Sequence, residues 1–345
     1  MEAQLDLTAQ PVTDPTSIYR YRDGLYAVDL LTAAITEFDF FTWLGAHPSN
    51  LAEICRNFGI VERPTDVMLT LFTAMNLIRS KAGIFEPTEL GREHLVSSSQ
   101  WFLGPYYGSL KDRPVCQDMI KVLRTGKPAT FASSKNEKEW AKAMEVEDFA
   151  KRFTAAMDCR GVYLAQAAAK QIDLSNHRQL LDIAGGSGIY ACSFVAHHPH
   201  LRATVFEKPP VDEIARRMIE SRGFSKRVRV ASGDMFKDRL PEECDVHLFS
   251  NVLHDWDEPL VQKLLAKSVE ALPSGGLIVI HDAHINAEKT GPLPVAAYSA
   301  LLMNITEGKC YSVAEMQGCL TRAGFGDFHF AETAADRSVL TAKRP

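Results

Sequence analysis

The sequence lacks a long uninterrupted hydrophobic run, an apolar core near its first residues and any pair of closely spaced cysteines, and each absence excludes a class of protein. The uncharged stretch 290–306 contains two prolines and several polar residues, so it is not typical of a membrane span. The first 15 residues include Glu2, Asp6 and Asp14 without an apolar core, so we expect no secretory signal. An odd, scattered set of cysteines indicates reduced thiols in a cytoplasmic protein rather than a disulfide scaffold or a structural zinc site. The seven cysteines are Cys55, Cys116, Cys159, Cys192, Cys244, Cys310 and Cys319.

The sequence also lacks an excess of positive charge. The chain has 38 Lys and Arg residues against 43 Asp and Glu residues, a formal net charge of −5. This balance provides no long-range attraction to nucleic acid or to anionic lipid. With 345 residues, of which 46% are hydrophobic and 23% charged, the sequence is instead typical of a globular protein with about two domains.

The N-terminal part of the chain is predicted to be helical. After a flexible arm over residues 1–16, apolar residues recur at helical spacing, and the segment 78–86 forms two short strands joined by a turn at Gly83. Two helices followed by a small hairpin are the arrangement of a winged helix, a module that often binds DNA. Residues 17–100 carry 7 basic against 10 acidic side chains, so they lack the basic face that a DNA reader needs. We therefore expect their apolar stripe to pack within the module or against a partner subunit.

The remainder of the chain divides into a connector and an alternating pattern. Turn residues and aromatic side chains between 104 and 128 favour a connector, and a helix is expected from about 137 to 172. Strands and helices then alternate, which predicts a parallel sheet with helices on both faces. The expected strands are 180–184, 203–206, 228–231, 246–250 and 277–281, and the expected helices are 188–198, 211–222 and 258–272.

The C-terminal end departs from this alternation. A helix near 312–323 is followed by two strand-like runs, 325–330 and 338–342, with no helix between them. These runs predict an antiparallel hairpin at one edge of the sheet. The expected fold is thus an α/β, Rossmann-like doubly wound domain over 131–345, preceded by a helical winged-helix domain over 17–130.

A glycine-rich turn joins the first strand to the following helix, in the sequence LLDIAGGSG over 180–188. Such a turn lets the backbone approach a ligand at a helix N-terminus, and it formally fits a dinucleotide-binding pattern as well as a tight turn without ligand. The next strand ends discriminate between ligands. Glu207 can take both hydroxyls of a ribose, while Asp234 can accept from an adenine amino group that Met235 covers. Asp182 suits an ammonium group better than a pyrophosphate. Together they favour S-adenosylmethionine over a dinucleotide.

A histidine follows the fourth strand, on the side where parallel sheets bind ligands. His254, in the sequence NVLHDW, can act as a general base near neutral pH, or it can simply hydrogen-bond a neighbouring loop. Asp282 ends the next strand and is placed to orient the His254 ring across the sheet end. His281 and His284 lie nearby in the sequence but lack the spacing of a metal site, so we expect no metal.

These residues carry a resemblance to a known family. The chain from about Ile18 to its end resembles the class I S-adenosylmethionine-dependent O-methyltransferases of the caffeate and acetylserotonin type, whose microbial relatives methylate small aromatic molecules. The resembling segments are LLDIAGGSG, ATVFEKPPV, RVRVASGDMF, NVLHDWDEP, ALPSGGLIVIHD and AGFGDF. The resemblance implies a homodimer formed by the helical domain and a catalytic pair of His254 with Asp282. It also implies cofactor contacts from Ala184, Gly185, Glu207, Asp234, Met235 and Ser250, with Met157 near the reacting methyl group.

Three positions depart from the family pattern. Ala184 stands where glycine is usual, and Glu207 replaces an aspartate. Cys310 falls where plant members place a second glutamate that orients the histidine, so either Glu307 serves after a local shift or the base has a single acidic partner. Met303 and Asn304 are further candidates to contact the acceptor, with core packing as their alternative.

The function predicted from the sequence is methyl transfer to a hydroxyl of a small aromatic acceptor. A phenol, with a pKa of about 10 as in tyrosine, suits a histidine base far better than an aliphatic alcohol does. Methylation of an activated carbon and a non-methylating use of the cofactor remain open. A nicotinamide oxidoreductase is less consistent with Asp182. A winged-helix transcriptional regulator is less consistent with the missing basic face.

Overall fold

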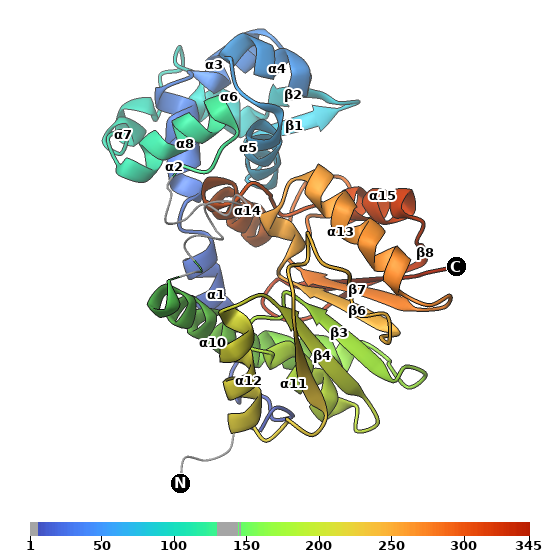
Figure 1. Ribbon diagram of the computed structural model, residues 1–345. Coiled ribbons are helices and arrows are strands. Elements are labelled where there is room, and N and C mark those ends of the chain that lie inside the picture. The colour runs from blue at the N-terminus through green and yellow to red at the C-terminus, as the bar shows by residue number, and fades with distance from the viewer. Residues whose placement is uncertain (1–5, 130–143, 145) are drawn as a thin grey trace. The chain divides into compact units, whose positions relative to one another are not determined.

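The structure is a computed structural model that describes residues 6–129, 144 and 146–345, and these group into two compact units (Figure 1). The sheet unit takes the described residues of Met1–Ser17, Glu137–Ala283 and Glu315–Pro345. The helical unit takes those of Ile18–Asn136 and His284–Ala314.

The helical unit is built from short helices and one hairpin. Helix α1 (Thr16–Asp23) leads into it. The other elements are α2 (Ala27–Thr36), α3 (Phe40–Ala46), α4 (Leu51–Phe58), α5 (Glu62–Ala74), β1 (Ile78–Lys81), β2 (Ile84–Pro87), α6 (Glu89–Leu95), α7 (Gly104–Gly108), α8 (Pro114–Thr125) and α14 (Leu293–Ile305). Helices α4 and α5 followed by the antiparallel pair β1–β2 give the helix, helix, hairpin order that the sequence predicts.

Local signals explain where these elements begin and end. Helix α4 starts at a capping box in which the Asn50 side chain accepts from the Glu53 amide and the Glu53 carboxylate accepts from the Asn50 amide. It ends at Gly59, which adopts the left-handed conformation that favours glycine. Phe40 and Phe41 then pack beside Phe72 with ring centroids 5.9 and 5.3 Å away, so aromatic contacts form much of the core of this unit.

The expected connector at 104–128 is wrong, because this stretch contains helices α7 and α8. The turn residues lie at the helix ends instead of forming an irregular loop. Pro114 occupies the first turn of α8, where its missing N–H costs nothing, and Gly126 caps the other end with φ +69°. Residues of α8 such as Met119 and Leu123 are fully buried. The apolar spacing inside α8 therefore outweighs the turn signals around it.

Residues 284–314 group with the helical unit, whereas the strand–helix pattern predicts a single domain over 131–345. The reason lies in α14, in which every residue from Val295 to Asn304 is buried. A helix that is apolar on all sides must be covered on all sides, and α14 packs against α2, α5 and α8. The chain thus returns to the helical unit after β7 has been completed.

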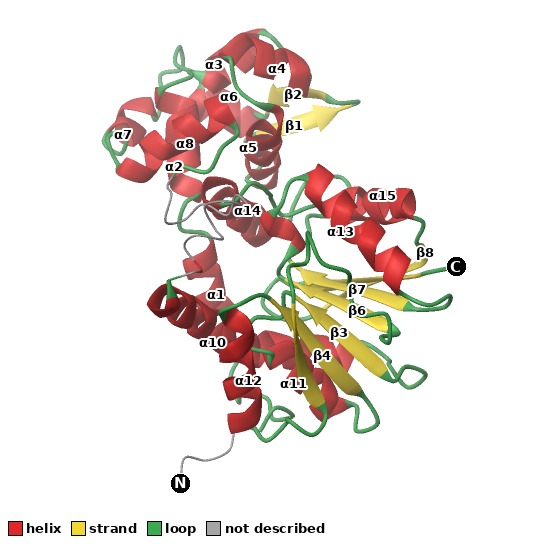
Figure 2. Ribbon diagram, viewed as in Figure 1, coloured by secondary structure: helices red, strands yellow, loops and turns green. Residues whose placement is uncertain are grey.

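The sheet unit contains one twisted sheet of seven strands with helices on both faces (Figure 2). Its strands are β3 (Gln179–Ile183), β4 (Arg202–Glu207), β5 (Val228–Ser232), β6 (Val246–Ser250), β7 (Leu277–Asp282), β8 (Gly326–Glu332) and β9 (Ser338–Lys343). Its helices are α10 (Glu147–Gln171), α11 (Ile189–His197), α12 (Val211–Ser221), the 3-10 turn η2 (Leu253–Asp255), α13 (Glu258–Ala271) and α15 (Val313–Ala323). All five predicted parallel strands and the three crossover helices are confirmed to within two residues.

The strand order β5-β4-β3-β6-β7-β9-β8 makes this a doubly wound sheet. The five strands from β5 to β7 are parallel, and β9 and β8 add an antiparallel hairpin at one edge, as the sequence predicts. Strands β6 and β7 are buried over almost their whole length, which explains their continuous apolar runs. The order reverses next to β3, so ligands are expected at the carboxyl ends around this strand.

Residues 1–5 of the expected flexible arm lie outside the described residues. Over 6–15 the chain lies on the sheet unit instead of extending freely. Leu7 is only 2% exposed, and the Gln10 amide donates to the Gln166 side chain of α10. The helix expected from 137 starts, in the described residues, at Glu147.

In the described part of the chain, no helix combines the length and apolarity needed to span a bilayer. All seven cysteines are free thiols.

Gly161 offers a test of the packing between α10 and α11. A Cβ at this position would lie 2.4 Å from Cγ2 of Ile189, a β-branched side chain with little freedom to move. We expect Gly161→Ala to lower the free energy of unfolding by about 1–3 kcal/mol through overpacking. Gly318 in α15 is the matched control, because its added Cβ meets only the Arg322 guanidinium at 3.5 Å. Gly318→Ala should raise stability by about 0.5–1 kcal/mol. Urea denaturation measures both, and equal gains for the two variants would contradict the packing.

Candidate functional site

The candidate site lies at the carboxyl ends of the parallel strands, where the register brings successive strand ends together. Glu207 at the end of β4 is paired with Ser232 at the end of β5. Ser250 at the end of β6 is paired with His281, directly before Asp282. The loops that follow β3, β4, β5, β6 and β7 therefore share one edge of the sheet, and this edge holds most of the residues singled out from the sequence.

The loop from Ala184 to Gly188 joins β3 to α11, and two of its glycines are required by contacts within the chain. A Cβ on Gly185 would lie 2.6 Å from the carboxyl group of Asp182, so the bare backbone of Gly185 covers that carboxylate. A Cβ on Gly188, which has φ +75°, would meet Ile219 at 2.9 Å. Gly186 has no heavy atom within 4 Å of such a position. Other atoms of the protein therefore fill the space next to Gly185 and Gly188, whereas the space next to Gly186 is open.

Asp182 is fully buried beneath this loop. Its Oδ2 accepts a hydrogen bond of 3.1 Å from the Ala191 amide in the first turn of α11. Its Oδ1 is buried without a hydrogen-bond partner among the described residues. Burial raises the pKa of Asp182 to about 7, against the lowering effect of the Ala191 amide and with a smaller contribution from the charge of Glu207. A carboxylate in this position is stabilised by a cation or by a strong hydrogen-bond donor.

Ala184 is the residue that stands in place of the expected glycine. It has φ +54°, which is left-handed backbone that costs an ordinary residue about 1–2 kcal/mol. Its amide donates to the Phe206 carbonyl at 2.9 Å, which links the loop to the end of β4. Alanine at this position therefore carries the backbone strain that glycine would avoid.

Glu207 lies half-buried beside the glycine loop. Its Oε2 accepts from the Gly186 amide at 3.0 Å and its Oε1 from the Lys208 amide at 2.9 Å. Burial raises the pKa of Glu207 above its usual value, although both amides act against this shift. Because an ionised carboxylate has about four lone-pair positions, two acceptor positions remain for a ligand with hydroxyl groups.

Asp234 and Met235 follow β5. Burial alone would raise the pKa of Asp234, but the Phe236 amide and the Lys237 ammonium outweigh burial and lower it. The Phe236 amide donates to Oδ1 at 2.9 Å, and Lys237 Nζ lies 3.0 Å from Oδ2. A Cβ on Gly233 would lie 2.4 Å from the Phe206 ring, so glycine is required at this approach. Met235 is half-buried beside it.

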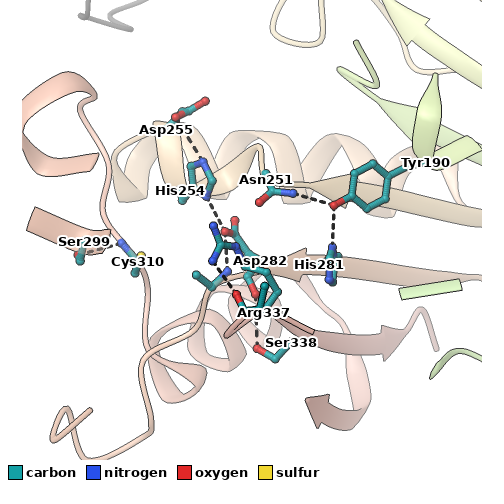
Figure 3. Close-up of polar contacts among 12 residues, drawn as sticks. Tyr190, Asn251, His254, Asp255, His281, Asp282, Ser299, Cys310, Arg337 and Ser338 are labelled. Atoms are coloured by element: carbon teal, nitrogen blue, oxygen red, sulfur yellow. Dashed lines mark hydrogen bonds and ion pairs between the residues drawn. The ribbon is translucent and has the colours of Figure 1, made fainter. Parts of the chain in front are cut away.

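His254 lies in the turn η2 directly after β6 and is only 3% exposed. Its Nδ1 is 2.5 Å from Oδ1 of Asp282 at the end of β7 (Figure 3). Since an ionised carboxylate is an acceptor only, Nδ1 carries the proton and the neutral ring keeps its lone pair on Nε2. The same Asp282 oxygen accepts from the Ala283 amide at 2.8 Å, which fixes the carboxylate in turn.

A second carboxylate near this histidine was not expected from the sequence. Oδ1 of Asp255 lies 3.5 Å from Nε2 of His254. The neighbouring positions of the two residues were the available signal, but adjacency alone does not show that both side chains turn the same way. The 3-10 geometry of η2 brings them together.

The remaining candidates are divided between the two units. Met157 on α10 and Ser250 on β6 are half-buried in the sheet unit. Met303, Asn304, Glu307 and Cys310 belong to the helical unit, where Met303 and Asn304 are buried within α14. Cys310 is buried, and its amide donates to Ser299 at 3.1 Å, so it is part of the packing of this unit. The expected roles of Met303, Asn304 and Glu307 stay predictions.

The geometry fits S-adenosylmethionine. Asp182 offers a buried carboxylate oxygen without a hydrogen-bond partner among the described residues, and the open position beside Gly186 offers room next to the loop. Glu207 and Asp234 present carboxylates at the next two strand ends, as an aminoacyl nucleoside requires. Among the described residues, no group of three or more His, Cys, Asp or Glu side chains could hold a metal ion.

Comparisons with known proteins agree with this geometry. Residues 117–326 match the family model of the O-methyltransferase domain. The 3-hydroxy-5-methyl-1-naphthoate 3-O-methyltransferase of Streptomyces sahachiroi is 30% identical over 334 residues, which cover 95% of each chain. The tetracenomycin polyketide synthesis 8-O-methyl transferase of Streptomyces glaucescens is 26% identical, over 97% of this chain and 98% of that protein. The crystal structure of an O-methyltransferase family 2 protein from Planctomyces limnophilus, in complex with apigenin, has a TM-score of 0.90 and 32% identity, covering 99% of this chain and all of that one.

Asp182 gives the site a pH-dependent stability that can be measured. Because its pKa is raised from 3.8 to about 7 in the folded protein, ionisation destabilises the fold progressively as the pH rises from about 4 to 7. Asp182→Asn keeps an acceptor for the Ala191 amide but cannot ionise. We expect the melting temperature of Asp182→Asn minus that of wild type to increase between pH 5 and pH 8, because only wild type loses stability as Asp182 ionises. Each pKa unit of the shift corresponds to about 1.4 kcal/mol.

The exposed carboxylate of Asp173 provides the control, because Asp173→Asn should show no such rise. Thermal denaturation of the ligand-free proteins at several pH values makes the comparison. A constant offset of Asp182→Asn at every pH would contradict the raised pKa.

Proposed function

Because this chain belongs to the S-adenosylmethionine-dependent O-methyltransferase family, we propose that it methylates a phenolic hydroxyl of a small aromatic acceptor, with His254 as the general base. The contact that supports this role most directly is the one of 2.5 Å between His254 Nδ1 and Asp282 Oδ1. It leaves Nε2 as the basic nitrogen of a buried ring whose orientation is fixed.

The protein's part in the reaction is to receive a proton and to stabilise the resulting charge. Nε2 of His254 takes the proton of the acceptor hydroxyl as the oxygen becomes a nucleophile. The imidazolium that forms lies between Asp282 at Nδ1 and Asp255 at 3.5 Å from Nε2. General-base assistance of this kind contributes about 10²–10⁴-fold to a rate. Asp255 thereby offers a second carboxylate without the plant-type glutamate that Cys310 replaces.

When bound, S-adenosylmethionine supplies an electrophilic methyl group on a sulfonium. The acceptor oxygen would receive this methyl carbon, and the cofactor's sulfur would keep the electron pair of the carbon–sulfur bond. We assign the binding of this cofactor to Asp182, Ala184, Gly185, Glu207, Asp234, Met235 and Ser250. Holding oxygen and carbon at about 3–3.5 Å contributes about 7–11 kcal/mol through orientation, and Met157 is the candidate that lies against the methyl group.

The relatives support an aromatic acceptor. One is named for methylation of a hydroxynaphthoate, and another was crystallised with apigenin. Such hydroxyls have pKa values of about 10, within reach of a histidine base. Some relatives methylate carbon or nitrogen instead, so methylation of an activated carbon is the second candidate. Incubation with S-adenosylmethionine and a panel of phenols, followed by mass spectrometry and fragmentation of the products, distinguishes the two and also tests whether any methyl group is transferred.

We expect His254→Ala to reduce kcat by about 10²–10⁴-fold with little change in affinity for the cofactor product. The variant removes the base without touching the glycine loop or the carboxylates assigned to the cofactor. Calorimetric titration with S-adenosylhomocysteine measures the affinity, and product formation at saturating cofactor measures kcat. Undiminished turnover of His254→Ala would refute the assignment of the base.

A homodimer is proposed from the start of the helical unit. Four large apolar side chains recur there at a spacing of three or four residues, and all are exposed: Ile18 at 72%, Tyr21 at 88%, Leu25 at 43% and Val28 at 37%. Ile18 and Tyr21 lie on α1, Leu25 in the turn after it and Val28 on α2. Exposed apolar side chains that follow one another so closely are typical of a surface that packs against another chain. A second copy of this chain is the partner that the family resemblance implies.

We expect wild-type protein to sediment as a dimer and Tyr21→Asp to shift it toward the monomer, because the substitution places a charge among these exposed apolar side chains. Phe328→Asp is the control, since Phe328 is also an exposed apolar side chain, at 36%, but lies on the edge strand β8. Analytical ultracentrifugation over a range of concentrations measures the equilibrium. A monomeric wild-type protein at all concentrations would contradict the proposal.

A further inference from the structure

Tyr190 lies on α11 next to the glycine loop, and its side chain is at the centre of a buried polar network. The ring is only 6% exposed. Its hydroxyl oxygen is 3.0 Å from Nδ2 of Asn251 and 3.1 Å from Nδ1 of His281. Nε2 of His281 is in turn 3.0 Å from the hydroxyl of Thr333. Figure 3 shows the Tyr190 hydroxyl between Asn251 and His281, with His254 and Asp282 on the other side of Asn251.

The chemistry of these groups fixes the direction of one hydrogen bond in the network. The Asn251 side-chain nitrogen can only donate, so the Tyr190 oxygen accepts from it. The Tyr190 hydroxyl shares a second hydrogen bond with Nδ1 of His281, and Nε2 of His281 shares a third with the Thr333 hydroxyl. Burial raises the pKa of Tyr190, which keeps the phenol protonated and able to donate. Each side chain of this hydrogen-bonded network therefore restricts the orientation of its neighbour.

The two partners of the Tyr190 hydroxyl, Asn251 and His281, are close in sequence to the proposed catalytic pair. Asn251 precedes His254 by three residues and follows the end of β6. His281 is the residue directly before Asp282 in β7. The backbone N–H of Asn251 also donates to the backbone carbonyl of His281 at 2.9 Å. Asn251 adopts a left-handed backbone conformation there, with φ +52°. The strand ends that carry His254 and Asp282 are thus joined once through the backbone and once through Tyr190.

We propose that Tyr190 is a positioning residue for methyl transfer: its hydroxyl holds the ends of β6 and β7 together so that His254 stays aligned with Asp282. This inference rests on the proposed function of His254 as the base. Tyr190 does not exchange a proton with the acceptor in this role. Its contribution passes entirely through His254, and that dependence is what an experiment can measure.

The test is a double-mutant cycle with Tyr190→Phe and His254→Ala, using a phenol that the product assay shows to be methylated. Tyr190→Phe keeps the ring and removes only the hydroxyl. We expect kcat to fall by about 10- to 100-fold, as small misalignments of reacting groups do, with the affinity for S-adenosylhomocysteine changed less than twofold. In the His254→Ala background, Tyr190→Phe should cause no further loss of kcat. Tyr163→Phe is the control, because Tyr163 is a half-buried tyrosine of α10 outside this network, and its kcat should equal that of wild type.

A second variant guards against a folding defect. His281→Leu removes the other partner of the Tyr190 hydrogen bond. It should therefore cause the same loss of kcat and, like Tyr190→Phe, no further loss in the His254→Ala background. This variant provides the test if Tyr190→Phe is unstable. Equal losses from Tyr190→Phe in the presence and absence of His254 would overturn the inference, because Tyr190 would then act independently of the base. A loss confined to cofactor affinity would overturn it as well. Full activity of His254→Ala alone would instead refute the proposed base, which separates failure of the proposed function from failure of this inference.

Discussion

The hydrogen bond between His254 and Asp282 is the contact on which the proposed chemistry depends. Neither residue is close to the other in sequence, and only the parallel register of β6 and β7 brings their two loops together. The carboxylate selects one tautomer of the imidazole and stabilises the charge that proton transfer creates. Small changes in the pairing of these two strands would therefore alter reactivity before they altered the fold. The backbone and side-chain links between Asn251 and His281 act on this same pairing.

The glycine loop imposes a second constraint. Asp182 and Glu207 approach it from adjacent strands, and burial raises the pKa of both. Burial removes water from both carboxylates, and a cationic ligand compensates for that loss when the carboxylates are ionised. A sulfonium nucleoside with an ammonium group meets this requirement, whereas an anionic dinucleotide does not. Charge therefore favours the cofactor class that the family uses.

The sequence predicted most of the sheet unit because each parallel strand there is a short apolar run with a helix after it. The ends of these runs also located Glu207, Asp234, His254 and Asp282, since the carboxyl ends of parallel strands share one edge. Three features could not be predicted. The turn residues around α8 concealed a helix whose packing decides its structure. The grouping of α14 with the N-terminal helices depends on contacts between residues more than 150 positions apart. Asp255 and Tyr190 gained their contacts from backbone geometry that no residue pattern encodes.

The interrupted course of the helical unit has a consequence for how the protein is made. Its first helices leave the ribosome long before α14, which is synthesised only after β7 of the sheet unit. Until then, the faces of α2, α5 and α8 that α14 covers remain uncovered. These apolar faces therefore stay uncovered while the sheet unit is synthesised, and neither unit can be completed as an independent N-terminal folding domain. Completion of both units is tied to the last third of the polypeptide.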